Sequence, residues 1–465
     1  DRLYQADKHA EPFWQPNEVG GHLNEDYFGG DLKGIQQKLP YLHEMGVDFI
    51  YLNPIFEAHS NHRYNTADYL NVDPLLGTNE DFETLCKEAA KYGNGIVLDG
   101  VFSHTGSDSR YFNREGRYGE GGAYRDPNSP YRSWYDFDSK YKGGYRSWWG
   151  FETLPEVNEE TPSYVEFITG EGGVIDTWLR RGAAGFRLDV ADELPDEFIE
   201  KVRTAVKRVG PDKFLLGEVW EDATTKFGFD KRRTYLLGKG LDSVMNYPFK
   251  NAVLDFVKGK PAEQAMTEIL TICEHYPAPA MDTALNFLST HDTERALTVI
   301  ADEPANGRGR AWQSGRCVTG DAYEEGLLRL RMAYAIIYTL PGVPCLYYGD
   351  EIAMQGYRDP FNRAFFRWDA HEQRLRPVLA QLAQLRHTCE AFRTGQLRVL
   401  RAEDGILHYQ RVGKVETAEI IVNRTEHIIV ETLASGKSTE VNPMGFTIVV
   451  EEVGHNPNHS YYDYV

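Results

Sequence analysis

Carboxylic side chains stand at or just after the ends of three apolar runs in this sequence. Asp189 lies near the end of AGFRLDV, Glu218 near the end of KFLLGEV, and Asp292 two residues after ALNFLST. If these runs are parallel strands, their carboxyl ends meet at one edge, where barrel enzymes carry their functional side chains. Retaining hydrolysis of a glycosidic bond needs a carboxylate nucleophile and a carboxylic acid about 5 Å apart. The spacing therefore predicts a site of this kind.

Basic residues beside these carboxylates support the same chemistry. Arg187 precedes Asp189 by two positions, so both side chains share one strand face and the guanidinium keeps the aspartate ionised. His104 follows the run that contains Asp99, and His291 follows the run ALNFLST. Histidines at such positions donate to sugar hydroxyls and favour an oxocarbenium-like state. For Asp99, a purely architectural ion pair with Arg187 is an equally good interpretation.

The elements that must position these residues alternate between strand and helix. The apolar runs are continuous and rich in β-branched and aromatic residues, which is typical of parallel strands buried on both faces. Their number and the total length favour an α/β fold of the (β/α)8 TIM barrel type over an open sheet. The predicted strands are 47–52, 96–102, 184–190, 213–219, 241–246, 284–290 and 343–348. The predicted helices are 31–45, 79–92, 162–182, 196–209, 250–275, 321–339 and 370–393.

The barrel needs an eighth strand, which is either the short segment 2–6 (RLYQA) or a segment that precedes Asp1. A long insertion rich in Gly, Tyr, Arg and Ser follows the third strand, and such insertions usually build the wall of the active site. Alternating patterns after about residue 395 predict a C-terminal antiparallel β-domain. The predicted organisation is a barrel over 1–104 and 161–394, an inserted loop-rich domain over 105–160, a β-sandwich over 395–455 and a tail over 456–465.

Composition limits the class of partner. The 465 residues allow one large domain and a smaller one. Seventy acidic against fifty basic side chains give a formal charge of −20, which disfavours nucleic acid and anionic membranes. The 28 Tyr, 23 Phe and 8 Trp exceed the needs of a core of this size, and aromatic faces stack on sugar rings.

Cysteine usage and hydropathy bear on location. The five cysteines are scattered without a CxxC pair, so no disulfide framework is predicted. No run of eighteen apolar residues and no signal-peptide pattern is present. These features favour the cytoplasm, while secretion or a periplasmic location stays open if an upstream segment was removed.

Eight motifs, in order along the chain, resemble those of the α-amylase family of glycoside hydrolases. Four of them contain the residues discussed above, and four flank them. They are DGVFSH at 99–104, GFRLDVADE at 185–193, GEVW at 217–220, FLSTHD at 287–292, GGDLKGI at 29–35, GVDFIYLNPIF at 46–56, SNHRYNTADY at 60–69 and GVPCLYYGDE at 342–351.

The resemblance implies a role for each residue. Asp189 resembles the nucleophile, Glu218 the acid/base, and Asp292 the carboxylate that grips sugar hydroxyls and strains the ring. Further residues resemble those that contact substrate: Arg187, His104 and His291 around the attached sugar, Tyr64 as the platform beneath it, Asp99 behind it, Asp359 and Arg363 at the next sugar, and Trp220 on the leaving-group side.

Within the family, MNYPF at 245–249 and LPEVN at 154–158 most resemble the neopullulanase, cyclomaltodextrinase and maltogenic amylase group. That group accepts cyclodextrins, pullulan and short maltodextrins, and some members transfer glucose. The implied partner is an α-glucan, and homodimer formation stays open. No cofactor is implied. Because Ser103 stands where many relatives have a calcium-binding Asn, calcium is not expected there, although the insertion contains oxygen ligands for another site.

Other functions are weighed against these motifs. A transferase, a trehalose-forming isomerase or a sucrose-active enzyme of the same family uses the same carboxylates. A non-catalytic glycan-binding relative would have lost one of the three. A phosphate-using barrel would carry a loop such as GxxxxGKS, which is absent from the sequence, as are the metal motifs CxxC and HExxH.

Overall fold

The structure is a computed structural model that describes residues 12, 14, 24–453 and 460–464. Its chain divides into two compact units, which are described one at a time: 29–245, and 246–465 together with the described part of 3–28. The segment 2–6, one of the two candidates for the eighth strand, lies outside the described residues.

The first unit is built on a five-stranded parallel sheet of order β1-β4-β5-β6-β9. Nearly every residue of its three middle strands is buried, which explains their continuous apolar sequences. This confirms five of the predicted strands. The strands are β1 Phe49–Tyr51, β4 Gly95–Gly100, β5 Gly185–Leu188, β6 Phe214–Gly217 and β9 Ser243–Val244.

Helices of the first unit follow local sequence signals. A capping box at Thr78 starts α3, and acidic residues in the first turn and basic residues in the last turn flank α6. The predicted helix 31–45 is two helices because Pro40 opens a new first turn, and 162–182 is two because glycines interrupt it at 170–173. The helices are α1 Leu32–Gln37, α2 Leu39–Glu44, α3 Asn79–Lys91, α4 Pro162–Thr169, α5 Val174–Arg180 and α6 Asp196–Val209.

The segment 105–160, all of which is described, contains turns and 3-10 helices without an α-helix or a named strand. Packed aromatic rings hold it together, with Phe112 in contact with Tyr135 and Tyr145. The 3-10 helices are η1 Arg132–Trp134, η2 Lys142–Gly144 and η3 Trp148–Gly150. Elsewhere in the unit are η4 Ala191–Glu193 and two hairpins, β2 Phe56–Ala58 with β3 Thr66–Val72 and β7 Phe227–Gly228 with β8 Lys231–Arg232.

The second unit contains a parallel pair of strands, β10 Leu285–Asn286 and β11 Val343–Pro344, which confirms the last two predicted strands. Gly259 and Pro261 divide the predicted helix 250–275 into α7 and α8. The helices are α7 Tyr247–Lys258, α8 Ala262–His275, α9 Ala278–Asp282, α10 Ala296–Ala301, α11 Arg310–Ser314, α12 Gly320–Thr339, α13 Leu375–Thr388 and α14 Ala391–Thr394, with η5 Asp350–Ile352 and η6 Phe361–Arg363.

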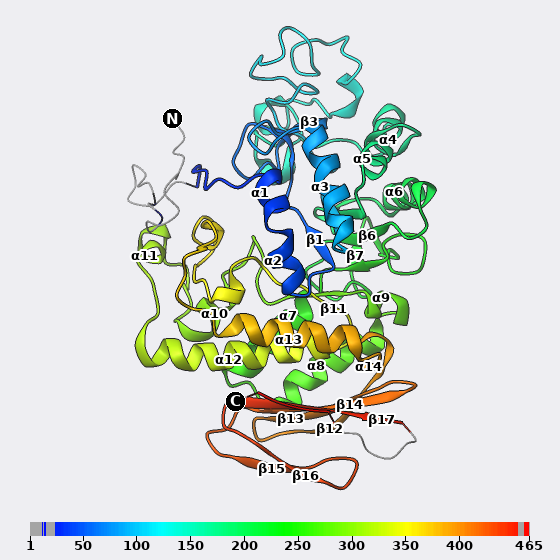
Figure 1. Ribbon diagram of the computed structural model, residues 1–465. Coiled ribbons are helices and arrows are strands. Elements are labelled where there is room, and N and C mark those ends of the chain that lie inside the picture. The colour runs from blue at the N-terminus through cyan, green and yellow to red at the C-terminus, as the bar shows by residue number, and fades with distance from the viewer. Residues whose placement is uncertain (1–11, 13, 15–23, 454–459, 465) are drawn as a thin grey trace. The chain divides into compact units, whose positions relative to one another are not determined.

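The chain ends in an antiparallel sheet of order β12-β13-β14-β17-β18, which α8 and α12 pack against (Figure 1). Residues 460–464, which the sequence analysis assigned to a tail, form β18 and pair with β17. The prediction of a tail is therefore wrong for these residues. An unpaired edge strand favours such pairing, because its backbone N–H and C=O groups have no other partner in the sheet. The strands are β12 Gln396–Glu403, β13 Ile406–Val412, β14 Glu416–Asn423, β17 Gly445–Glu452 and β18 Ser460–Tyr464, beside a separate hairpin of β15 Ile429–Thr432 and β16 Ser438–Val441.

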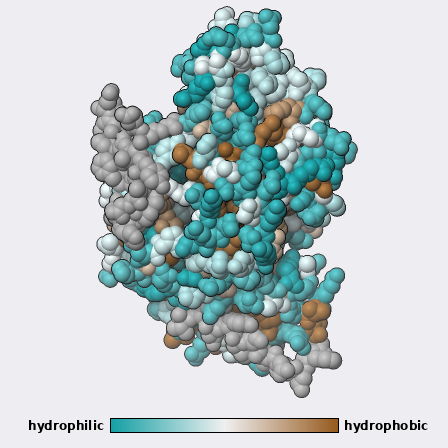
Figure 2. All heavy atoms as spheres, turned by 45° about the horizontal axis from the view of Figure 1, so that its top comes forward, coloured by the Kyte–Doolittle hydropathy of each residue, from teal (hydrophilic) through white to brown (hydrophobic). Residues whose placement is uncertain are grey.

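General surface features agree with the composition. The face in Figure 2 is mainly hydrophilic, with small hydrophobic patches between. All five cysteines are free thiols. Within the described ranges, no helix is both long and apolar enough to cross a membrane.

A buried polar cluster stabilises the C-terminal sheet. Glu419 accepts hydrogen bonds from His408 Nε2 at 2.6 Å and Gln410 Nε2 at 2.9 Å, and the Ala434 amide donates to it at 3.2 Å. Burial by itself would raise the pKa of Glu419, but these hydrogen bonds lower it below its ordinary value. The carboxylate is therefore the form that the fold stabilises.

Replacement of Glu419 by glutamine should destabilise the protein at neutral pH. Glu419→Gln places an amide NH2 group where the Gln410 side chain and the Ala434 amide donate to a carboxylate oxygen, so one buried donor loses its acceptor. We therefore expect the free energy of unfolding to fall by about 1–3 kcal/mol. Because the folded pKa is depressed, the wild-type advantage is present above the unfolded pKa and is lost as pH falls through the folded one. Urea unfolding at several pH values measures this, and Glu440→Gln on the exposed face of β16 is the control. An equal loss in both variants would contradict the prediction.

Candidate active site

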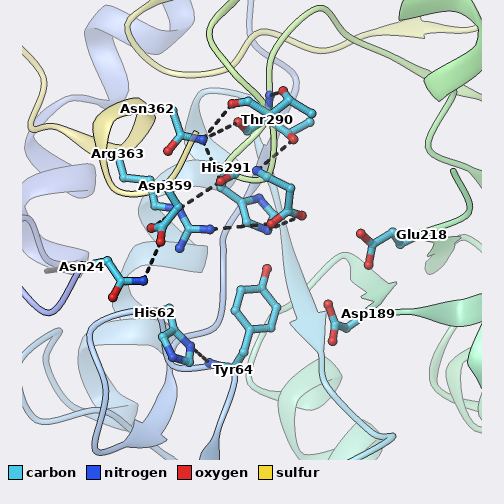
Figure 3. A network of polar contacts seen from close by, with 12 residues as sticks. Asn24, His62, Tyr64, Asp189, Glu218, Thr290, His291, Asp359, Asn362 and Arg363 are labelled. Atoms are coloured by element: carbon cyan, nitrogen blue, oxygen red, sulfur yellow. Dashed lines mark hydrogen bonds and ion pairs between the residues drawn. The ribbon is translucent and has the colours of Figure 1, made fainter. Parts of the chain in front are cut away.

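Three adjacent parallel strands bring the predicted carboxylates of the first unit to one edge. Asp99 on β4 and Arg187 on β5 are direct cross-strand partners. Asp189 and Glu218 follow the last residues of β5 and β6, and their amides donate to carbonyls of the neighbouring strands at 3.1 and 3.0 Å. Figure 3 shows the side chains of Asp189 and Glu218 pointing in the same direction, toward the side where Tyr64 lies.

Arg187 contacts all three carboxylates of this edge, and its side chain is fully buried. Its Nη1 donates to Asp99 Oδ1 and to Asp189 Oδ1, each at 2.8 Å. Its Nη2 forms an ion pair with Glu218 Oε2 at 2.9 Å. Burial by itself would lower the pKa of Arg187, but Asp99 and Glu218 raise it well above its ordinary value. The sequence analysis includes the contacts of Arg187 with Asp189 and with Asp99, and it does not include the contact with Glu218.

Two tyrosine hydroxyls donate hydrogen bonds to the other carboxylate oxygen of Asp99. Tyr51 and Tyr64 donate to Asp99 Oδ2 at 2.7 and 2.8 Å. Burial raises the pKa of Asp99, and Arg187 with the two tyrosines opposes the rise. Sequence analysis missed Tyr51, although its place at the end of β1, paired with β4, could have indicated it.

His104 uses both ring nitrogens inside the protein. Its Nε2 lies 2.9 Å from the Tyr64 carbonyl oxygen, and its Nδ1 lies 3.0 Å from the Ser103 hydroxyl. Since a carbonyl only accepts, Nε2 carries the proton and Nδ1 accepts from Ser103. Burial, with a smaller effect from His62, lowers the pKa of His104 to about 4. The imidazole is therefore neutral at neutral pH and holds the backbone at Tyr64.

The backbone after the nucleophile candidate is strained. Val190 has φ 41° and ψ 49°, a left-handed conformation that a β-branched residue rarely adopts. In this conformation its amide donates to Glu218 Oε2 at 2.9 Å, while the Trp220 indole donates to Glu218 Oε1 at 2.9 Å. Both oxygens of Glu218 are thus oriented by neighbours.

Two tryptophans of the inserted segment contact the turn that follows Asp189, and the sequence analysis did not predict these contacts. Trp148 Nε1 donates to Glu193 Oε2 at 2.7 Å and Trp149 Nε1 to Glu193 Oε1 at 2.9 Å. The ring of Trp148 lies 5.6 Å from that of His104. The pair of tryptophans before LPEVN, and an acidic residue four positions after Asp189, are the signals that could have indicated them.

Four further predicted residues belong to a network within the second unit. His291 Nε2 lies 3.1 Å from Asp292 Oδ2, and Arg363 lies 3.6 Å from Asp292 and 3.3 Å from Asp359. Asn362, which sequence analysis missed, donates to the backbone oxygens of His291 and Thr293 at 2.8 Å, as Figure 3 shows for His291. Within the first unit, contacts join the other predicted residues, which are Tyr64, Asp99, His104, Arg187, Asp189, Glu218 and Trp220.

The expectation that no calcium binds at Ser103 stays a prediction. The Ser103 hydroxyl is hydrogen-bonded to the His104 imidazole. Across the part of the chain that the structure describes, no group of three or more His, Cys, Asp or Glu side chains is close enough to hold a metal ion.

Comparisons with known proteins agree with this fold and site. The family described as "Alpha amylase, catalytic domain" matches residues 9–381. An amylopullulanase of Thermoanaerobacterium saccharolyticum is 35% identical over 84% of this chain and 32% of its own length, and a cyclomaltodextrinase of Geobacillus thermopakistaniensis (strain MAS1) is 33% identical over 86% and 63%. The solved structure of cyclic alpha-maltosyl-(1→6)-maltose hydrolase from Arthrobacter globiformis is 26% identical, with a TM-score of 0.80 over 97% of this chain and 98% of that one.

The chain belongs to the α-amylase family of glycosidases, and its relatives include cyclomaltodextrinases and neopullulanases. Its fold is the α-amylase catalytic domain followed by an antiparallel sheet. The chain spans about a third of the amylopullulanase and less than two thirds of the cyclomaltodextrinase that it matches.

Loss of the Arg187 guanidinium should destabilise the first unit strongly. Arg187→Met leaves three buried carboxylates without this cation, so we expect the free energy of unfolding at pH 7 to fall by about 3–5 kcal/mol. Arg180→Met, at an exposed arginine whose buried partner Asp176 is also paired with Arg208, is the control and should cost less than about 1 kcal/mol. Denaturant unfolding measures both losses. Similar losses in the two variants would contradict the prediction, and Asp99→Asn added to Arg187→Met should recover part of the stability.

The buried neutral His104 should make the fold sensitive to acid. Between the unfolded pKa near 6.5 and the folded value of about 4, the unfolded chain binds the extra proton, so stability falls as pH falls. Relative to a His104→Asn variant, the wild type should lose about 2–3 kcal/mol between pH 7 and pH 4.5. Urea unfolding at the two pH values measures the difference. His427→Asn, at an exposed site, should follow the wild type, and a His104→Asn variant with wild-type acid sensitivity would disprove the assignment.

Proposed function

We propose that this chain hydrolyses α-glucosidic bonds with retention of configuration, with Asp189 as nucleophile and Glu218 as acid/base. The observation that supports this most is their arrangement at the ends of neighbouring parallel strands, where Arg187 contacts both carboxyl groups. Retaining glycosidases need two carboxyl groups close together, and a shared guanidinium partner keeps these two close.

In the first step, an Asp189 carboxylate oxygen attacks the anomeric carbon while protonated Glu218 gives its proton to the departing glycosidic oxygen. The bond to the leaving sugar breaks as the bond to Asp189 forms. In the second step, Glu218 takes a proton from water, whose oxygen displaces Asp189 and restores both carboxyl groups. This chemistry uses carboxyl groups alone, so we expect no cofactor to be required.

The surroundings of the two carboxyl groups suit these roles. The Arg187 hydrogen bond to Asp189 Oδ1 favours the ionised, nucleophilic form, and its effect is strong because the site is buried. The indole of Trp220 and the amide of Val190 fix the orientation of Glu218. The Tyr64 ring, whose hydroxyl is held by Asp99, serves as the platform beneath the reacting sugar.

The four predicted residues of the second unit complete the proposal. We expect Asp292, with His291 beside it, to bind hydroxyls of the reacting sugar, and Asp359 with Arg363 to contact the next sugar. Their mutual contacts support this, because a carboxylate held by His291 and Arg363 is presented in one orientation.

Maltodextrins, cyclodextrins, pullulan and starch are the proposed substrates, in keeping with the names of the relatives. Transfer to a sugar acceptor shares the covalent intermediate, so a transferase activity is the alternative that product analysis separates. We expect no nucleic acid or membrane partner, and the proposed location is the cytoplasm.

The test is hydrolysis of β-cyclodextrin, pullulan and soluble starch by the wild type and three variants. Glu218→Gln removes the proton donor and should lower kcat by about 10²–10⁴ on whichever substrate is cut. Asp189→Asn should lose activity by at least as much. Glu221→Gln, an exposed glutamate in the loop after Glu218, is the matched control and should keep the wild-type rate. Proton NMR of the first product should show the α-anomer.

The outcomes separate the alternatives. A β-anomeric first product would overturn the retaining mechanism, and equal activity of Glu218→Gln would overturn the role of Glu218. Oligosaccharides longer than the substrate would indicate transfer instead of hydrolysis.

A further inference from the structure

Two solvent-exposed aromatic side chains are held against the turn that follows Asp189. Trp149 is 77% exposed and Phe229 is 52% exposed. Trp149 belongs to the inserted segment 105–160, and Phe229 lies between β7 and β8, in the loop that starts at Glu218. The turn between them is η4, Ala191–Glu193.

Trp149 is anchored through its indole nitrogen. Its Nε1 donates to Glu193 Oε1 at 2.9 Å, while the ring itself remains in solvent. The neighbouring Trp148 donates to the other oxygen of Glu193, so this carboxylate is held from both sides. The contact fixes the position of the Trp149 ring without burying it.

Phe229 is anchored through Arg233. The Arg233 guanidinium lies 5.2 Å from the centre of the Phe229 ring, and Arg233 is buried. Its Nη1 donates to the carbonyl of Asp192, its Nη2 to the carbonyl of Leu194 at 2.5 Å, and its Nε to Asp196. The hairpin therefore contacts the same turn as Trp149. Arg233 binds the carbonyl of Asp192, and Trp149 binds the side chain of the next residue, Glu193.

The backbone at both rings is unfavourable for large side chains. Trp149 has φ 51° and Phe229 has φ 53°, in the left-handed region. Two-residue hairpin turns of this kind usually carry Asn-Gly or Asp-Gly, whereas this one carries Phe229 and Asp230, both with positive φ. Glycine would suit both positions better, and large exposed rings add no burial, so a functional use is the simplest physical explanation.

The chemistry of this surface fits a neutral sugar chain. Nearby cations are paired, Lys226 with Asp192 and Glu221 at 3.0 and 2.6 Å, and Arg233 with Asp196 at 2.8 Å. The exposed ring faces of Trp149 and Phe229 lie beside exposed charged residues of the hairpin, such as Lys231, which is paired with Glu197 at 2.7 Å. Aromatic faces of this kind stack on the apolar faces of sugar rings. The loop after Glu218 lies on the leaving-group side, because Glu218 is the proposed donor to the departing oxygen.

We infer that Trp149 and Phe229 bind the part of an α-glucan that extends beyond the cleaved bond on the leaving-group side. The inference rests on the proposed function and adds a chain-length preference to it. Long substrates reach both rings, whereas a trisaccharide does not extend beyond the cleavage site far enough to use them.

The test is the ratio of kcat/KM for soluble starch to kcat/KM for maltotriose. Trp149→Gly and Phe229→Gly remove one ring each. Relief of the positive φ opposes the loss of the Trp149–Glu193 hydrogen bond or of the Phe229–Arg233 contact, so thermal unfolding should occur near the wild-type temperature. Each should lower the ratio about five- to tenfold, in line with one lost aromatic–sugar contact. Phe229→Tyr keeps a ring and should keep the ratio. Phe49→Ala, at an exposed phenylalanine that opens β1 at the opposite end of the strand, should also keep it.

A binding measurement separates this inference from the proposed function. Retardation in native gels that contain amylose should be weaker for both glycine variants than for the wild type, whether or not the wild type hydrolyses amylose. A wild type without hydrolysis but with variant-sensitive retardation would overturn only the proposed function. Unchanged ratios and unchanged retardation in both glycine variants would overturn the aromatic binding surface.

Discussion

One buried cation organises the edge of the parallel sheet. Arg187 touches Asp99, Asp189 and Glu218 from the middle strand of three, and none of its side chain reaches solvent. Burying a guanidinium is costly unless carboxylates surround it, and burying three carboxylates is costly without a cation. Neither half of this arrangement is stable alone. The strands β4, β5 and β6 must therefore keep the register that brings the four groups together.

The loops that follow these strands are fixed by polar contacts rather than by regular structure. The turn after Asp189 binds tryptophans of the inserted segment through Glu193 and the β7–β8 hairpin through the carbonyl of Asp192. Val190, in its strained conformation, points its amide at Glu218. A short turn thus connects the nucleophile candidate, the acid/base candidate and two aromatic side chains, which accounts for how irregular segments hold a defined geometry.

Neutral groups complete the electrostatics of the edge. His104 is uncharged because burial lowers its pKa to about 4, and it holds Tyr64 through a backbone carbonyl. Tyr64 and Tyr51 in turn donate to Asp99. Each group has its partner within the protein, so the carboxylates of Asp189 and Glu218 are oriented before any substrate binds. Such preorganisation is what lowers the reorganisation cost of a charged reaction.

The sequence by itself determined the parallel strands, because their buried faces require continuous apolar runs, and it determined the seven first-unit residues that now form one network. The sequence analysis predicted continuous helices across Pro40 and Gly259, but the structure divides each of them there. A single proline or glycine ends a helix even where the apolar pattern continues. Only the tertiary structure decided that Tyr51, Glu193 and Trp149 contact this site, that 460–464 adds a strand, and that Arg187 serves three carboxylates at once. These features depend on contacts between residues far apart in the chain, and the local signals at such positions do not say which residues meet.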